Sequence, residues 1–440
     1  MTLFSLSILQ LISLILSYLS SRNIFSLLFL STLCLSSNFI GALFLSNFCV
    51  ESCLTPLYIS LGTFSLVLGA FIMSKFTKPS IINWIRSDEI EIRYPKGQSK
   101  IFFYTLLIVT FFCLILALLL FLKKGIPLLS EDIETARQLV FRNAGLYYRT
   151  VRFSLPFLSI LWMSYAFYIQ KKTIKAAMVF VVLLSAIFLL FAGYKGIVFG
   201  FALLILMFLS VKLKKSFKKI AILTLILFFG LASIVYVTYV TQKFYNTSFI
   251  QSVQFIFSRL TTIAVEGFYI IVNNFLPQEG LQYGKTIING LKDFLAIFRL
   301  VPREEIEEVG FGVFLMRWVW GYNPLNYAYT VTVFGDFLAN FGLPGLIILS
   351  FLFGIFIQKL YISTLKYSKD IFIFPSLIFL QWILFNIVER GSIDMATTFD
   401  LFSFLLIFII FVSIFIVLSL PTGVVKYKFY RLNLKRIKNK

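Results

Sequence analysis

Residues 176–211 read AAMVFVVLLSAIFLLFAGYKGIVFGFALLILMFLSV, a run of 36 residues whose single charge is that of Lys195. As one helix the run would be about 54 Å long at 1.5 Å per residue, whereas the hydrocarbon core of a bilayer is about 30 Å thick. The run must therefore break, and Gly193-Tyr194-Lys195-Gly196 is the break that it offers. We expect two membrane helices joined by a tight turn that carries Lys195.

Apolar runs recur through the whole chain of 440 residues. Hydrophobic residues make up 59% of the chain and charged residues 13%, against about 25% charged in a typical soluble protein. Together with a mean hydropathy of +0.92, this excludes a water-soluble surface. We predict one all-α polytopic integral membrane domain over 1–440. About eleven spans, within a range of ten to twelve, are expected at 3–19, 24–45, 56–73, 101–122, 153–169, 176–192, 196–211, 220–240, 343–358, 371–388 and 400–420.

The distribution of lysine and arginine predicts the orientation, because these residues favour cytoplasmic loops. With the tail 426–440 in the cytoplasm, the cytoplasmic segments hold 25 basic and 4 acidic residues, and the outer segments hold 15 of each. The net charge of +21 then lies on one face, and the N-terminus lies outside. We expect this basic excess to contact anionic lipid at the cytoplasmic face, and we expect no nucleic-acid partner.

Two outer segments, 123–152 and 241–342, are too long to be plain turns, while the cytoplasmic loops are short and basic. Long connections in a compact protein are usually functional. We therefore predict a protein of the cytoplasmic (inner) membrane whose active site faces the periplasm or the cell exterior.

The composition excludes several kinds of chemistry. The chain has no histidine, which removes a histidine base, a serine–histidine triad and a histidine-ligated metal. No CxxC, Walker or DxD motif is present, so we expect no metal and no cofactor. Cys49 and Cys53 either pair outside the cell or are, like Cys34 and Cys113, small apolar residues in helices.

Segment 123–152 combines a helix start with a cluster of arginines. Ser130 is predicted as the N-cap of a helix whose first turn favours negative charge. Three acids there are either capping charges or a metal site: Glu131, Asp132 and Glu134. Four arginines follow, and their guanidinium groups either bind phosphate or lie at the membrane interface above apolar stems: Arg137, Arg142, Arg149 and Arg152.

Segment 241–342 opens with an amphipathic stretch, 250–275, whose apolar residues recur every three or four positions. This pattern predicts a helix that lies at the interface or packs on the bundle. Arg259 and Glu266 share one face, either as an exposed ion pair or as a site cation with a carboxylate. The acidic run 304–308 is either a solvated helix start or a site for a divalent ion.

Residues 317–329 interleave five aromatic rings with asparagine and glycine. Such rings stack on the apolar faces of sugars, and the alternative is the aromatic belt of a membrane interface. The candidate glycan-binding residues are Trp318, Trp320, Tyr322, Asn323 and Tyr327. Further on, Asp336 stands at the mouth of the ninth span, where an acid must be solvated or paired.

Several short motifs resemble the oligosaccharide repeat-unit polymerases, the Wzy-type O-antigen polymerase family. GIPLLS at 125–130, with Arg137, is similar to the segment after an early span of that family. AGYKG at 192–196 is similar to its turn of small residues and a cation between two mid-chain helices. FGD through ANFGLPG at 334–345 resembles the entry into a late span, and RGS at 390–392 fits after the next one.

This resemblance implies the C-type glycosyltransferase architecture that these polymerases share with O-antigen ligases. The implied enzyme joins one polyprenyl-diphosphate-linked (undecaprenyl-type) oligosaccharide to the end of another, in lipopolysaccharide or capsule synthesis. A flippase and a chain-length regulator are its implied partners. O-antigen ligases usually carry a functional histidine in the large outer loop, so the absence of histidine disfavours the ligase alternative without excluding it.

The leaving diphosphate develops negative charge, and without a metal site arginine and lysine must neutralise it. Lys195 and Arg137 are the first candidates, and the alternative for Lys195 is a lysine that only fixes its turn. The other candidates for contact with the diphosphate are Arg142, Arg259, Arg317 and Arg390. The base must be a carboxylate, for which Glu266 and Asp336 are the candidates. The main rival function is a flippase for lipid-linked glycans, which is expected to have two similar halves.

Overall fold

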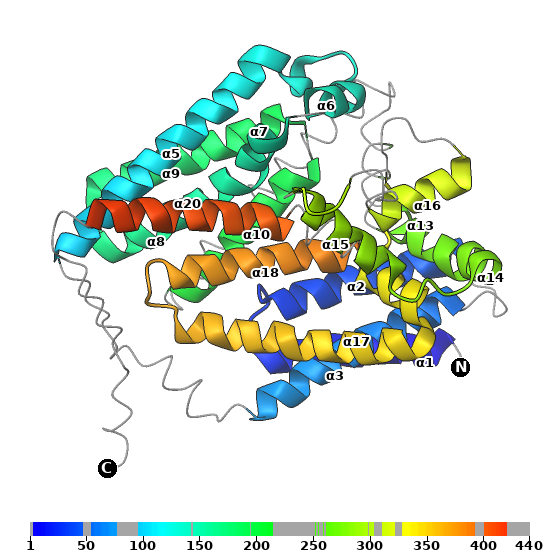
Figure 1. Ribbon diagram of the computed structural model, residues 1–440. Helices are drawn as coiled ribbons and strands as arrows, with labels where there is room; N and C mark the ends of the chain where they lie inside the picture. The colour runs from blue at the N-terminus through cyan, green and yellow to red at the C-terminus, as the bar shows by residue number, and fades with distance from the viewer. Residues whose placement is uncertain are drawn as a thin grey trace, which may run out of the picture.

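The structure is a computed structural model that describes residues 3–46, 54–76, 96–141, 144–193, 195–213, 251, 254, 258, 261–297, 299–302, 310–321, 328–391 and 400–419. Over these residues every regular element is a helix (Figure 1). Seven of these helices are long and apolar enough to cross a membrane, and three shorter apolar helices accompany them: Val198–Lys212, Phe311–Trp320 and Ile373–Glu389. The prediction of an all-α polytopic membrane protein is confirmed.

The predicted spans correspond to helices wherever the structure describes them. The span expected at 153–169 is α8, extended at its start by the π-helix η3, and the span expected at 220–240 lies outside the described residues. The helices that coincide with the predicted spans are α1 Leu3–Ser21, α2 Leu27–Leu45, α3 Leu54–Phe76, α5 Lys96–Lys124, η3 Thr150–Ser154, α8 Leu155–Ile169, α9 Lys172–Phe191, α10 Lys195–Lys212, α17 Thr332–Lys366, α18 Ile373–Arg390 and α20 Phe402–Ser419.

The remaining elements belong to the two long segments predicted to lie outside, 123–152 and 241–342, which keep the name outer segments below. The first segment forms the short 3-10 turn η2 and two helices, and the second forms a helix with a π-turn, an amphipathic helix and a short apolar helix. Their bounds are η2 Pro127–Leu129, α6 Ile133–Phe141, α7 Gly145–Arg149, α13 Thr262–Ile270, η4 Ile271–Phe275, α14 Leu276–Glu279, α15 Lys285–Ile297 and α16 Phe311–Trp320.

The long apolar run breaks where its length requires. Helix α9 ends at Phe191, Gly193 adopts a φ of +73°, and α10 begins at Lys195. A positive φ suits glycine because it has no Cβ to clash with the backbone. The predicted turn between two helices is therefore confirmed.

The helices pack in two groups with α18 between them. Helices α1, α2 and α3 lie against α17, whereas α5 lies against α8 and α20. Glycines allow α3 and α17 to approach closely, because a Cβ added at Gly354 would lie 1.8 Å from the carbonyl oxygen of Leu66. Small residues have this role in many membrane-helix interfaces. Helix α18 contacts α17 and α2 on one side and α8 and α10 on the other.

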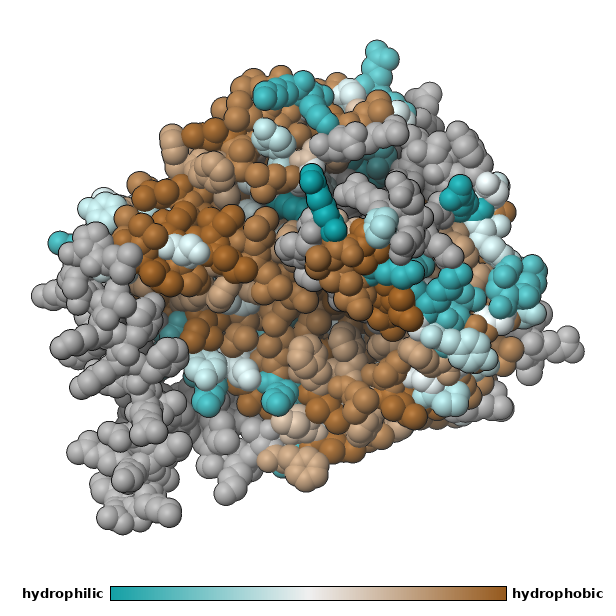
Figure 2. Space-filling view, viewed as in Figure 1, coloured by the Kyte–Doolittle hydropathy of each residue, from teal (hydrophilic) through white to brown (hydrophobic). Residues whose placement is uncertain are grey.

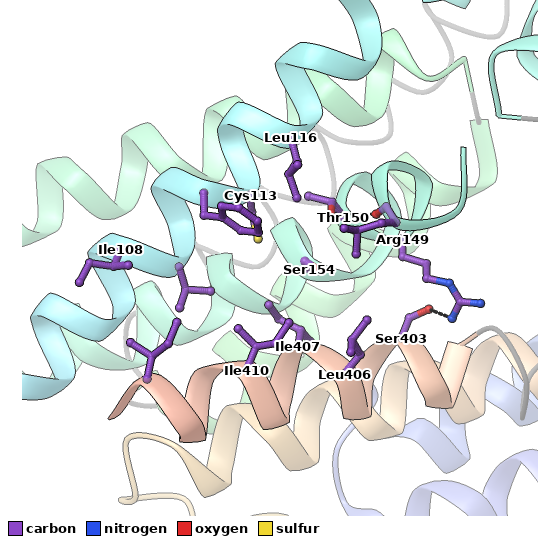
Figure 3. A pocket seen from close by; sticks show the side chains of 14 residues that line it. Ile108, Cys113, Leu116, Arg149, Thr150, Ser154, Ser403, Leu406, Ile407 and Ile410 are labelled. Carbon is purple, nitrogen blue, oxygen red and sulfur yellow. Dashed lines mark hydrogen bonds between the residues drawn. The ribbon is translucent and has the colours of Figure 1, made fainter. Parts of the chain in front are cut away.

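The elements of both outer segments lie at one end of the bundle, together with the N-terminus. In Figure 1, α7 lies in the upper middle with α6 to its right, α13–α16 lie in the right half, and α17 and α20 end at the left. Figure 2 shows apolar side chains across the middle of the molecule, with hydrophilic ones towards the top and the right and a smaller group at the lower left. Helices α5 and α20 run side by side, and an apolar groove lies between them (Figure 3).

Candidate functional site

Helix α6 begins with a capping carboxylate. The backbone N–H of Thr135 donates to Oδ1 of Asp132 at 3.0 Å, so Asp132 acts as the N-cap. The expectation of Ser130 as the cap is wrong, because its hydroxyl instead donates to the carbonyl oxygen of Pro127 at 2.6 Å. The backbone N–H of Ser130 donates to the same oxygen and closes η2. Of the two readings of the acids, the structure gives Asp132 the capping role.

Helix α6 packs directly on the turn between α9 and α10. A Cβ added at Gly193 would lie 2.8 Å from Cγ2 of Ile133, the first residue of α6, and 3.6 Å from Cβ of Pro127. Arg137 lies one helical turn after Ile133, on the same face of α6, and its Nε is buried. Lys195 begins α10 two residues after Gly193. The backbones of Arg137 and Lys195 therefore both lie near the Gly193 turn.

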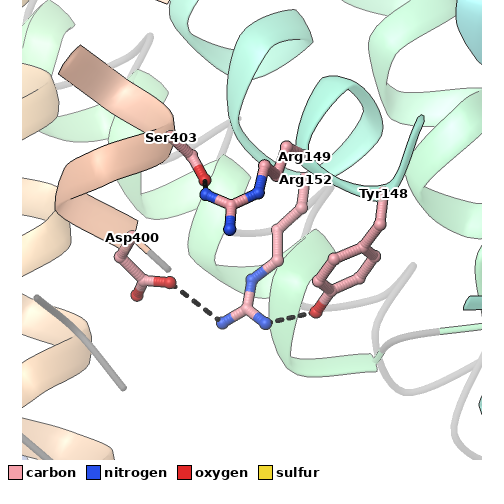
Figure 4. A network of polar contacts seen from close by, with 5 residues as sticks. All are labelled: Tyr148, Arg149, Arg152, Asp400 and Ser403. Carbon is pink, nitrogen blue, oxygen red and sulfur yellow. Dashed lines mark hydrogen bonds and ion pairs between the residues drawn. The ribbon is translucent and has the colours of Figure 1, made fainter. Parts of the chain in front are cut away.

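Two further arginines fasten this region to the start of α20 (Figure 4). Arg149 donates from Nη1 to Oγ of Ser403 at 3.0 Å, and its guanidinium lies 4.9 Å from the ring centroid of Phe402. Arg152 places Nη2 3.7 Å from Oδ1 of Asp400 and also donates to the hydroxyl of Tyr148. The guanidinium group of Arg149 therefore contacts the first turn of α20, and that of Arg152 contacts the acid just before it.

The same arginines are connected to α6 through an aromatic contact. The rings of Phe141, at the end of α6, and Tyr148 have centroids 4.8 Å apart. Residues 133–154, which carry Arg137, Arg149 and Arg152, are called the arginine ledge below. The sequence places Arg149 and Arg152 in a cluster of arginines but does not by itself predict their contacts at the start of α20. Two features of the sequence are nevertheless consistent with these contacts. Arg149 and Arg152 are three residues apart, and Asp400 stands just before α20.

A second polar centre surrounds Asp336 in α17. The Asp336 side chain is 1% exposed, and Thr286 of α15 donates to its Oδ1 at 3.4 Å. Asn340 donates from Nδ2 to the Thr286 hydroxyl at 2.7 Å and accepts from the backbone N–H of Gly284 through Oδ1 at 3.0 Å. These bonds attach the start of α15 to α17.

Asp336 lies in the first part of α17, before the bend at Gly342, and therefore precedes the span predicted to start at 343. The span was predicted to start at 343, whereas α17 begins at Thr332 and bends at Gly342, where φ is +67°. The bend exposes the carbonyl groups of Ala339 and Asn340, which accept from the backbone N–H groups of residues 282 and 283 at 2.8 and 3.0 Å. The loop before α15 thus provides hydrogen-bond donors for the carbonyl groups that the bend leaves unpaired within α17. A hydropathy pattern does not reveal such contacts.

The C-terminal end of α18 meets the start of α17. A Cβ added at Gly391 would lie 2.5 Å from the carbonyl oxygen of Thr332, so Gly391 permits a close backbone approach. Arg390 directly precedes this contact, and Asp336 lies one helical turn beyond Thr332. The two late motifs of the sequence are therefore neighbours in space.

Glu266 lies in α13, beside the segment that leads into α17. It is half-buried, and burial raises the pKa of its carboxyl group above the ordinary value. The neighbouring Gly267 allows close contact, because a Cβ there would lie 2.5 Å from the carbonyl oxygen of Thr330. The predicted partner Arg259 lies outside the described residues, so that pairing stays a prediction.

The aromatic stretch is divided between α16 and the residues that follow it. Trp318 donates from Nε1 to Oε1 of Glu279 at 2.9 Å, and Trp320, which is 69% exposed, donates to the hydroxyl of Tyr329 at 3.0 Å. Arg317 is exposed on the same helix. The predicted residues that lie outside the description are Tyr322, Asn323 and Tyr327, together with Arg142 and the acidic run 304–308.

A comparison with protein-family models finds one match, to the family described as "Putative O-antigen polymerase", over residues 19–399. The chain belongs to this O-antigen polymerase family. Neither the curated proteins nor the solved structures include a match to the chain. The predicted resemblance is confirmed. Membership implies a glycosyltransferase-like enzyme of polysaccharide biosynthesis, with a lipid-linked oligosaccharide as its substrate.

In this member of the O-antigen polymerase family, each of the four motifs that resemble the family lies at a contact between two elements. The first motif forms η2 and packs with α6 on the turn at Gly193, which is the second motif. The third motif forms the polar centre around Asp336, and the fourth contacts its helix at Thr332. The structure thus joins the motifs in two pairs at the same end of the bundle (Figure 1).

Proposed function

We propose that this protein polymerises oligosaccharide repeat units carried on polyprenyl diphosphate, at the outer face of the cytoplasmic membrane and without a metal ion. The observation that supports the proposal is the packing of α6 on the Gly193 turn. Arg137 lies on α6 one helical turn after Ile133, and Lys195 begins α10 two residues after Gly193. Cations held in place before the reaction stabilise a diphosphate leaving group without the cost of reorganising solvent.

In the proposed reaction, the bond between the anomeric carbon of one glycan and its lipid diphosphate breaks. A bond forms between that carbon and a hydroxyl oxygen of the second lipid-linked glycan, and the hydroxyl proton passes to a carboxylate. Arg137 and Lys195 offset the charge left on the released lipid diphosphate. Arg390, at the end of α18, is a further candidate cation on the side of the polar centre around Asp336. Arg142, Arg259 and Arg317 also remain candidates for contact with the diphosphate.

Glu266 is the preferred base. Its raised pKa brings proton affinity closer to neutral pH, where a general base is most effective. Asp336 is buried and bonded to Thr286 within the polar centre, which suits a positioning role better than free access to a sugar hydroxyl. Asp336 stays the second candidate.

The exposed edge of α16 suits contact with the growing glycan. Trp318 and Trp320 have their indole N–H groups directed to protein acceptors, and Trp320 leaves most of its surface open to stack on a sugar. Tyr322, Asn323 and Tyr327 follow in the sequence and are proposed to extend this surface.

Two other functions make different demands. A ligase would transfer the glycan to an acceptor other than a second repeat unit, and a flippase would move lipid-linked glycans without making bonds. The purified protein is therefore reconstituted in vesicles with one lipid-diphosphate repeat unit, EDTA and no other protein. Glycans of increasing length support a polymerase. Transbilayer movement without new bonds supports a flippase, and turnover that requires added magnesium contradicts the metal-independent mechanism.

A further inference from the structure

The groove between α5 and α20 lies beside the arginine ledge (Figure 3). It has a volume of about 250 Å³, and apolar side chains of both helices line it, among them Ile108, Leu116, Leu406 and Ile410. On α20 the lining extends from Ser403 to Ile414, which corresponds to about 17 Å along a helix. The groove thus follows the membrane helices for about half of the hydrocarbon thickness.

One end of the groove carries a positive charge. Arg149 lines it at the end where α20 begins, and Ser403 accepts a hydrogen bond from its guanidinium. Arg152 lies one helical turn further along the same ledge. The remaining lining is almost wholly apolar, and Cys113 at its floor is buried. An apolar groove with a guanidinium at one end is suited to bind an amphiphile that has a hydrocarbon tail and an anionic head.

We infer that this groove binds the hydrocarbon chain of a polyprenyl phosphate lipid, with the phosphate on Arg149. The groove is smaller than the range of about 300–1,000 Å³ found for pockets that enclose a whole small molecule, so it takes a stretch of one chain. A single-chain lipid fits this space better than a phospholipid with two acyl chains. The arginine presents the planar fork that binds phosphate oxygens.

The inference rests on the proposed function, since it assigns a tail site to that lipid substrate. The arginine ledge connects the two sites, because Phe141 and Tyr148 link α6 to Arg152. A lipid held by its tail between α5 and α20 presents its phosphate to the ledge that also carries Arg137.

The test uses the full-length protein in nanodiscs of phosphatidylcholine and a polyprenyl monophosphate with a photoreactive group near the end of its tail. We expect crosslinks in α5 or α20 within the groove. Unlabelled polyprenyl phosphate should compete, whereas phosphatidylglycerol at the same concentration should not. Arg149→Gln should weaken binding by about tenfold, through loss of a charge-assisted hydrogen bond.

Ile410→Trp and Leu406→Trp fill the groove and should each lower the crosslink yield to about a tenth. Ile409→Trp is the matched control, because Ile409 is 58% exposed on α20 and does not line the groove. Thermal unfolding of each variant identifies those that remain folded. Equal competition by phosphatidylglycerol, or wild-type crosslinking by a folded groove variant, would overturn the inference. Because no glycan is present, this result is independent of whether the protein polymerises repeat units.

Discussion

Glu266 has an ionisation behaviour that its position in α13 explains. Burial raises the pKa of its carboxyl group, so the native state favours the protonated form. The resulting stabilisation is present below the pKa of the unfolded chain and is lost as the pH rises through the raised value. Glu266→Gln is permanently neutral, so its Tm near pH 7 should exceed that of the wild type and vary less with pH. Thermal unfolding in detergent at several pH values measures both effects.

The same substitution tests the catalytic role of Glu266. A base must be deprotonated, so the rate of polymer formation should fall as the pH drops through the raised pKa. Glu266→Gln should lower the rate by about 10²–10⁴-fold, while Asp336→Asn measures the second candidate in parallel. Near wild-type rates from a well-folded Glu266→Gln protein would assign the proton transfer elsewhere.

At the scale of single elements, the contact between α6 and the Gly193 turn can be tested by steric substitution. Gly193→Ala meets both an unfavourable φ and the side chain of Ile133, so it should lower stability and polymer yield together. Gly125→Ala is the matched control, because Gly125 has a φ of +85° with nothing within 4 Å, and it should show only the backbone cost of about 1–2 kcal/mol. The Gly193→Ala, Ile133→Ala double variant should be less destabilised than the sum of the single changes.

Asn340 provides a second test, of the attachment of α15 to α17. Asn340→Leu removes the acceptor for the Gly284 N–H group and the donor to Thr286, at a cost of about 1–3 kcal/mol. Hydrogen exchange in 285–297 should become faster. Asn273→Leu removes a comparable bond to Thr55 of α3 and should leave exchange in α15 unchanged. Equally slow exchange in α15 after Asn340→Leu would show that other contacts hold it.

Hydropathy predicted the membrane helices because length and composition decide whether a segment can cross a bilayer. The break at Gly193 was predictable for the same reason. The capping role of Asp132 was one of two alternatives that the sequence left open for the acids before α6, and a local hydrogen bond to Thr135 decides between them. The bend at Gly342 was not predictable, because it depends on the backbone N–H groups that a neighbouring loop supplies. The contact of Arg152 with Asp400 joins residues from opposite halves of the chain, which no local pattern in the sequence encodes.

At the scale of the whole molecule, both outer segments should face the same aqueous compartment. Cysteines introduced at Leu129 and Tyr283, which are 71% and 78% exposed, should react with a membrane-impermeant reagent from outside intact cells. A cysteine at Lys172, at the opposite end of α9, should react only after the membrane is opened. Labelling of all three positions from one side would contradict the charge-based topology.

The central claim is that Arg137 and Lys195 offset the charge on the leaving diphosphate, and polymer formation by Lys195→Ala in reconstituted vesicles tests it most directly. Removing one preorganised group that stabilises developing charge costs about 10²–10³-fold in rate, so little or no polymer is expected. Lys195→Arg should keep part of the activity, and Lys172→Ala, at the other end of α9, should match the wild type. Wild-type polymer length and yield from Lys195→Ala would contradict the account and leave this lysine with the role of fixing its turn.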